Sequence, residues 1–266
     1  MENEINNENE SLDFGSRIPL DDLKQAVSSL KNQLAKVIVG QNDFVELLIA
    51  GLLSNGHVLI EGVPGVAKTL TAKLFAKSLE TNFSRIQFTP DLMPSDVLGT
   101  SVLNAQKGEF EFKPGPIFSN IVLIDEINRA PAKTQAALFE VMEERQITID
   151  GVQHDLEAPF MVLATQNPIE QEGTYALPEA QLDRFLFKIE VDYPSLEDEI
   201  NILKTHHDRK GSLPISQIEA VLNPKNLNEL KGQIQEIIME EKLMHYIASI
   251  VGKTRNSFHF TIGTNN

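Results

Sequence analysis

Short apolar runs alternate with helix-like segments through most of the chain, and this alternation restricts the fold more than any other feature. Four of the five runs are apolar at consecutive positions, as in strands covered by helices on both faces. Segments 68–79 and 132–145, which lie between runs, have the apolar spacing of helices. The runs are His57–Glu61, Arg85–Phe88, Ile121–Ile124, Phe160–Ala164 and Phe185–Val191. Their order predicts an α/β fold built on an open, mostly parallel sheet.

Two segments interrupt this alternation. The long connection between Asp91 and Asn120 holds the alternating string EFEF and the stiff string KPGP, which is typical of a small hairpin or of a helix and a strand. Segment 146–156 alternates on both sides of Asp150-Gly151, a strong signal for a two-residue hairpin turn. We therefore expect two hairpin-type insertions in the α/β plan.

The two ends of the chain differ in composition from its middle. Residues 1–16 carry five carboxylates, no basic residue and few apolar groups, so we expect a flexible acidic tail there. The α/β domain is then expected over 17–193, opening with two helices between residues 20 and 53 that the string VIVGQ separates.

A second, smaller domain is predicted over residues 194–266. Pro194 interrupts the chain, and Ser195 with Asp198 is typical of a capping box at the start of a helix. Because helical spacing continues from there to Arg255, we expect this domain to be all-helical.

The charge and the absence of cysteine restrict the possible partners and compartments. The formal net charge is −15, from 23 Lys and Arg against 38 Asp and Glu, which argues against nucleic acid or an anionic membrane as a partner. The chain has no cysteine, so disulfides and thiolate metal sites are excluded. No apolar run approaches the roughly 18 residues that cross a membrane, and the N-terminus does not have the pattern of a signal peptide. We expect a soluble cytoplasmic protein without membrane insertion.

The string GVPGVAKT, residues 62–69, joins the first apolar run to the first helix of the alternation and is close to a phosphate-binding loop. Gly62 and Gly65 permit the backbone to wrap a phosphate, and the helix that starts at Lys68 directs free N–H groups at it. Lys68 would contact the β- and γ-phosphates of a nucleotide, and Thr69 would hold Mg²⁺. Taken alone, the same pattern also fits a turn that merely packs a strand against a helix.

Ala67 is the one departure from the phosphate-loop pattern, because it stands where the pattern has its second glycine. A Cβ is tolerated there if the backbone stays in the helical or β region, which is what we expect. The predicted nucleotide contacts of this loop are Gly62, Val63, Pro64, Gly65, Val66, Ala67, Lys68, Thr69 and Leu70.

An acidic pair ends the third apolar run in the string NIVLIDEIN. Asp125 can hold Mg²⁺ through water, and Glu126 can act as general base for a water that attacks the γ-phosphate. The alternative is that two acidic residues simply end a strand. The phosphate loop 57 residues upstream favours the catalytic interpretation, since ligands on such sheets lie beyond the carboxyl ends of the strands.

Two further polar residues follow or precede strand-like runs. Asn167, in the string TQN after the fourth run, can orient the attacking water or contact the γ-phosphate, and it also fits a turn before Pro168. Arg184 lies at the start of the last run, where the local pattern favours a surface arginine paired with Asp183.

Together, several strings resemble the MoxR family of AAA+ ATPases from about Val37 to at least Arg255. They are VIVGQ, GVPGVAKT, TPDLMPSDVLGT, EFKPGPIF, IDEINRAPAKTQAALFEVMEERQITIDG and LATQNPIEQEGTYALPEAQLDRFLF. The resemblance implies a five-stranded AAA+ core with two insertions, those of the helix-2-insert clade, and a helical lid. It also accounts for Ala67, since the phosphate loop of that family commonly ends Ala-Lys-Thr.

The resemblance also implies roles for individual residues. Members of the family assemble into rings, usually hexamers, with ATP or ADP and Mg²⁺ bound between subunits. Arg184 would then be the arginine finger that reaches the neighbouring subunit's γ-phosphate, Asn167 would be the sensor 1 residue, and Arg129 would be a weaker candidate for an interface contact. Val39 and Gly40 would line the adenine pocket.

The sequence departs from the family pattern near Thr264–Asn266, where a Gly-Ala-Ser-Pro-Arg segment would supply the sensor 2 arginine. We therefore expect an incomplete lid with exposed apolar helix faces. The function implied is ATP-driven remodelling of protein clients, possible ones being proteins with von Willebrand factor A domains. A nucleotide-dependent scaffold with little turnover is the alternative, and a GTPase is disfavoured because no Asn-Lys-x-Asp motif is present.

Overall fold

The computed structural model describes residues 20–63, 65–167, 175, 177–208 and 212–255. They fall into two compact units: the larger holds residues 21–231, and the smaller holds Leu20 and residues 232–255. The acidic tail expected over 1–16, Pro64 and the expected sensor 2 position lie outside the described residues, and the domain boundary at 194 stays a prediction.

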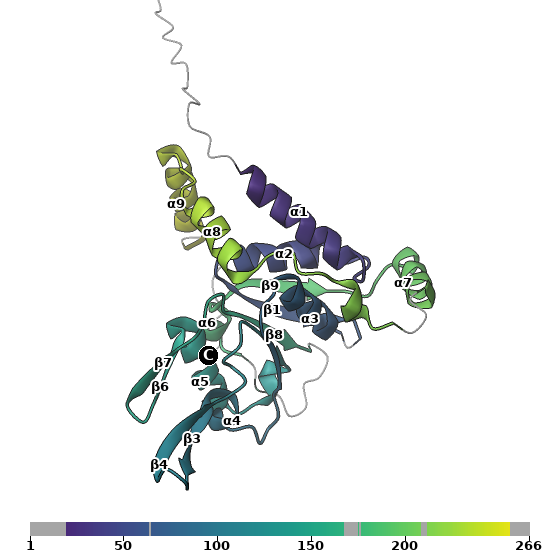
Figure 1. Ribbon diagram of the computed structural model, residues 1–266. Coiled ribbons are helices and arrows are strands. Elements are labelled where there is room, and N and C mark those ends of the chain that lie inside the picture. Colours follow the sequence, from purple (N-terminus) through teal and green to yellow (C-terminus); the bar gives the residue numbers. More distant parts are fainter. Residues whose placement is uncertain (1–19, 64, 168–174, 176, 209–211, 256–266) are drawn as a thin grey trace, which may run out of the picture. The chain divides into compact units, whose positions relative to one another are not determined.

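Five parallel strands form the central sheet of the larger unit, in the order β2-β5-β8-β1-β9. Figure 1 labels β8, β1 and β9 of this sheet. The strands are β1 (His57–Gly62), β2 (Phe83–Gln87), β5 (Ile121–Asp125), β8 (Met161–Gln166) and β9 (Phe185–Val191). The predicted α/β fold with a five-stranded sheet is thus confirmed. Since every pair is parallel, the carboxyl ends of all five strands meet at one edge of the sheet.

Helices cover both faces of this sheet and explain the consecutive apolar residues of its strands. Val58 and Ile60 of β1 pack in one buried cluster with α1 (Asp21–Ala35), α2 (Asn42–Leu53) and α3 (Lys68–Ser78). Leu59, on the opposite face, packs in a second cluster with α4 (Pro94–Leu98) and α5 (Ala132–Glu144). Alternate side chains of a strand point to opposite faces, so a strand covered twice needs apolar residues at every position.

The two predicted insertions are hairpins that project side by side (Figure 1). One pairs β3 (Gly99–Asn104) with β4 (Glu109–Pro114), and the other pairs β6 (Gln146–Ile149) with β7 (Val152–Asp155). Asp150 and Gly151 have φ of 51° and 78°, as expected for the two-residue turn. The hairpins contact each other, because Ser101 hydrogen-bonds Asp150 and the rings of Phe112 and His154 lie 4.2 Å apart.

The remaining elements are mostly helical. They are η1 (Ile127–Arg129), α6 (Glu179–Leu182), α7 (Leu196–Asp208), η2 (Pro214–Gln217), α8 (Pro224–Gln235) and α9 (Glu241–Arg255). The Asp198 N–H donates to Ser195 Oγ at 3.2 Å, which is the capping contact predicted for the start of α7. Leu243, Tyr246 and Ile250 of α9 are all more than 40% exposed, so this helix leaves apolar side chains uncovered. Among the residues that the structure describes, no helix combines the length and apolar character that a membrane crossing requires.

His57, the first residue of β1, is buried and predicts a pH dependence of stability. Its Nε2 donates to the Met142 carbonyl and its Nδ1 accepts the Val162 N–H, both at 3.0 Å. Burial lowers the pKa of His57 from 6.5 to about 4. The unfolded chain therefore takes up this proton first as the pH falls, and stability is lost between pH 6.5 and 4. We expect the free energy of unfolding to fall by about 2 kcal/mol between pH 7.5 and pH 5.

Urea unfolding at several pH values measures this loss. The exposed His206 of α7 supplies a control, because a His206→Gln chain should keep the same pH profile. A flat profile between pH 7.5 and pH 5 would contradict the assignment of a neutral, buried His57.

Candidate functional site

The loop between β1 and α3 lies at the carboxyl edge of the sheet, where the sequence predicts a phosphate site. Gly62 ends β1 so close to β9 that a Cβ would meet the Val191 carbonyl oxygen at 2.6 Å. Lys68 is the first residue of α3, and its Nζ donates to the Gly62 carbonyl at 2.6 Å. The ammonium group thus lies over the loop that it is predicted to share with a phosphate, and Thr69 follows it in the first turn of the helix.

Two carboxylates, one at the end of β5 and one directly after it, lie near Lys68. Partial burial lowers the pKa of Lys68, and the nearby negative charges of Asp125 and Glu126 oppose that shift. A binding site for a phosphate and its metal ion requires a cation close to acidic groups. The partly desolvated ammonium group of Lys68, which faces two carboxylates, meets this requirement.

Ala67 corrects one of our expectations. It has φ of 58° and ψ of 18°, in the left-handed region, and not in the helical or β region that we expected. The loop reverses its direction at the residue before α3, and this reversal is what imposes the positive φ. The conformation costs an alanine about 1 kcal/mol, because its Cβ crowds the following carbonyl.

An Ala67→Gly chain is therefore expected to be more stable than the wild type by about 0.5 kcal/mol, after the larger chain entropy of unfolded glycine is subtracted. Urea unfolding measures the change. The matched control is Ala136→Gly in the middle of α5, where the backbone is right-handed and glycine should destabilise by about 1 kcal/mol. A destabilisation of equal size at both positions would show that the φ of Ala67 is not positive in solution.

Asp125 ends β5 as a buried carboxylate with a donor on each oxygen. Arg85 Nε of β2 donates to Oδ2 at 2.5 Å, and Thr165 Oγ1 of β8 donates to Oδ1 at 3.2 Å. Only 8% of the residue is exposed. Three adjacent strands thus fix the position of this carboxylate.

Glu126 follows in a left-handed conformation with φ of 58°, which turns its side chain away from the strand direction. Its N–H donates to Thr165 Oγ1 at 3.0 Å. Its Oε2 accepts Gln87 Nε2 at 2.8 Å and Arg129 NH1 at 2.9 Å. The carboxylate is therefore held by named donors and remains 30% exposed to solvent.

The other two predicted catalytic residues, Asn167 and Arg184, lie next to two different strands. Asn167 directly follows β8, next to the strand that ends in Asp125, and is half-buried. Arg184 lies immediately before β9, and its guanidinium pairs with Glu143 of α5. The local pattern had favoured Asp183 as its partner. The Arg184 side chain is 39% exposed and accessible from outside the subunit.

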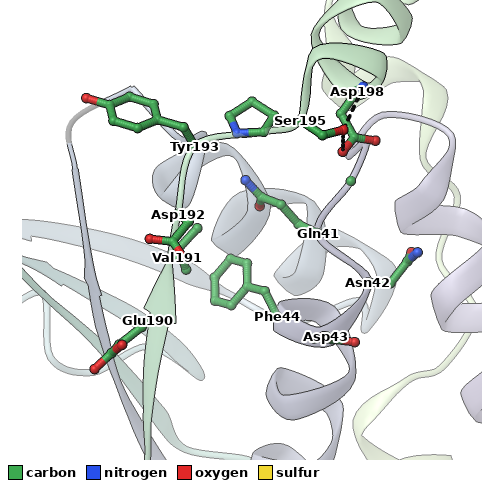
Figure 2. Close-up of a pocket in the computed structure, with 12 residues that line it drawn as sticks. Gln41, Asn42, Asp43, Phe44, Glu190, Val191, Asp192, Tyr193, Ser195 and Asp198 are labelled. Carbon is green, nitrogen blue, oxygen red and sulfur yellow. Dashed lines mark hydrogen bonds between the residues drawn. The ribbon is translucent and has the colours of Figure 1, made fainter.

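A pocket of about 460 Å³ lies between the start of α2 and the end of β9, and Ser195 and Asp198 at the start of α7 also line it (Figure 2). Gly40, predicted to line the adenine site, lines this pocket and has φ of 74°; Val39 directly precedes it. The pocket is joined to the phosphate loop by Gln41, whose Nε2 donates to the Val66 carbonyl at 2.9 Å. The pocket and the phosphate loop are therefore adjacent.

The residues present fit a magnesium ion. A threonine hydroxyl and one buried carboxylate are hard oxygen ligands, supplied by Thr69 in the first turn of α3 and by Asp125 at the end of β5. Mg²⁺ at nucleotide sites keeps several waters and takes one or two protein oxygens besides the phosphates, so this small donor set is sufficient.

Four of the residues in these contacts were not predicted from the sequence. They are Gln41, Arg85, Gln87 and Thr165. Two of them could have been found from the sequence. Arg85 and Gln87 are polar residues two positions apart in an otherwise apolar run, so they must point to the same face of the strand.

Comparisons with known proteins give the family of the chain. Residues 57–187 match the model of the ATPase family associated with various cellular activities (AAA). The chain is 48% identical to YeaC of Bacillus subtilis over 88% of its own length and 72% of that protein. It is also 48% identical to Chaperone MoxR1 of Mycobacterium tuberculosis, over 88% of its length and 59% of that protein.

A crystal structure of an ATPase candidate from Cytophaga hutchinsonii has the same fold. Its TM-score is 0.76 at 42% identity, and the match covers 90% of this chain and 73% of that one. The family match, the relatives and the shared fold lead to one conclusion: the chain belongs to the MoxR family of AAA+ ATPases.

Proposed function

We propose that this protein binds ATP with Mg²⁺ and hydrolyses it to ADP and phosphate. The observation that supports the proposal best is the convergence of Lys68, Asp125 and Glu126 at one edge of the sheet, beside a pocket large enough for a nucleoside. A strand-ending acidic pair that had only a structural role would not need a partly buried lysine opposite it.

Each residue of the site has a chemical role in this reaction. The N–H groups at the start of α3 and Lys68 bind the phosphates, and Thr69 with Asp125 would hold Mg²⁺, which neutralises charge on the transferred group. Glu126 accepts a proton as a water oxygen bonds to the γ-phosphorus and the bond to the β,γ-bridging oxygen breaks. Asn167 would orient that water.

The working form proposed is a ring of identical subunits, with a hexamer as the expected size. Arg184 would act on the nucleotide of the adjacent subunit, and its half-exposed side chain supports this role. The ring would remodel or mature protein clients in the cytoplasm, and proteins with von Willebrand factor A domains are the proposed client class. This part rests on family membership and on the word chaperone in the name of one relative.

A binding scaffold with little turnover is the second candidate. The contact that favours it is the pair of donors on Glu126 Oε2, since an oxygen that already accepts from Gln87 and Arg129 has to release a donor before it can accept from a water. In this case nucleotide would bind and change the protein's affinity for its partners without being consumed.

Steady-state phosphate release by the purified chain distinguishes the two candidates. A hydrolase should release phosphate in a Mg²⁺-dependent way, and its turnover per subunit should fall when dilution dissociates the ring. A scaffold should bind a fluorescent ATP analogue and release no more phosphate than a Glu126→Gln chain. Failure to bind the analogue at all would exclude both.

A further inference from the structure

Arg85 is a charged residue on strand β2 that reaches the acidic pair from the side opposite the phosphate loop. Strand β2 runs parallel to β5, with Gln87 opposite Asp125 in the register. From this position Arg85 Nε donates to Asp125 Oδ2 at 2.5 Å, and its NH2 group lies 3.4 Å from Gln87 Oε1. One guanidinium thus contacts the aspartate that would hold the metal ion and a residue that contacts Glu126.

The contact with Arg85 reduces the negative charge and the free oxygen atoms that Asp125 presents to a cation. Guanidinium stays protonated at all physiological pH values, so the carboxylate is neutralised by a permanent positive charge. The Oδ1 atom already accepts Thr165 Oγ1, and Oδ2 is occupied by Arg85. A divalent cation, or a water bound to it, must share these oxygens with two donors and must approach another positive charge.

The Arg85 side chain is 49% exposed, whereas that of Asp125 is 11% exposed. The arginine can therefore leave the pair by turning into solvent, while the backbone of Asp125 stays fixed in β5. The ion pair is thus a contact with one mobile partner and one fixed partner.

We infer that Arg85 is a positioning residue that acts through Asp125. It holds the carboxylate in place when no metal ion is bound, and it lowers the site's affinity for a divalent cation, which must displace the guanidinium from Oδ2. This inference rests on the proposed function, since it assumes that Asp125 serves a nucleotide-bound metal ion.

Direct measurement of ion binding tests the inference without any turnover. Mn²⁺ serves as the probe, and its free concentration is measured by electron paramagnetic resonance in the presence of saturating ADP. Arg85→Gln is expected to bind Mn²⁺ about fivefold more tightly than the wild type. This ratio is expected because the substitution removes a partly exposed guanidinium that competes with the cation for Asp125 Oδ2. Arg85→Lys keeps the positive charge and should stay nearer to the wild-type affinity.

Lys188→Gln is the matched control. Lys188 is also 49% exposed and pairs across two strands of the same sheet, with Glu61 Oε2 at 2.7 Å. Its loss should leave Mn²⁺ affinity unchanged, even if both glutamine chains melt at lower temperature. Equal or weaker Mn²⁺ binding by Arg85→Gln would overturn the inference and leave a purely structural ion pair. If the wild-type chain binds no ADP, the proposed function fails instead.

Discussion

A Glu126→Gln chain is expected to bind ATP as tightly as the wild type and to release phosphate at least about a hundredfold more slowly. The amide cannot take the proton of the attacking water, so the chemical step loses its general base. Binding should persist because the phosphates are expected to be held by Lys68 and the start of α3, whereas the hydrogen bonds of Glu126 go to Gln87, Arg129 and the Thr165 hydroxyl. A fluorescent ATP analogue measures affinity, and single-turnover phosphate release measures the chemical step.

The control for this substitution is Glu140→Gln, on the exposed side of α5 and outside the site. It makes the same change of charge and should keep full turnover. If Glu126→Gln turns over at the wild-type rate, another base must act, and the assignment of Glu126 fails. If it loses ATP binding as well, its role is in forming the site and not in catalysis.

The sheet and its site edge could be predicted because buried parallel strands require consecutive apolar residues, and that requirement is visible in the sequence. Lys68, Asp125 and Glu126 were predicted from the same logic, since each follows or ends such a strand. The end of β8 was less predictable. We expected it at Ala164, but Thr165 and Gln166 continue the ladder opposite Ile60 and Glu61 of β1.

Contacts between strands could not be predicted from one sequence. Arg85 meets Asp125 only because β2 lies beside β5 in a particular register, although the two residues are 40 positions apart. The left-handed conformation of Ala67 was missed for a different reason. Alanine usually signals a right-handed backbone, and the geometry of the loop overrides that preference.

Arg184→Ala is expected to lower turnover by about a thousandfold while each subunit still binds ATP. A finger acts on charge that develops at the γ-phosphate, so its loss affects the chemical step more than binding. In the single chain its partner is Glu143 of α5. A Glu143→Gln chain, which loses the same ion pair but keeps the guanidinium, is therefore the matched control and should keep its turnover.

Mixing two inactive chains decides whether Arg184 acts between subunits. An Arg184→Ala subunit has an intact site without a finger, and a Glu126→Gln subunit has an intact finger without a base. In randomly mixed rings, roughly a quarter of the interfaces would join an intact site to an intact finger, because each interface is formed head to tail by two different surfaces. Equal mixing should therefore restore phosphate release to about a quarter of the wild-type rate. If the mixture is no more active than its components, Arg184 acts within its own subunit or has no catalytic role, and the proposed interface between subunits fails with it.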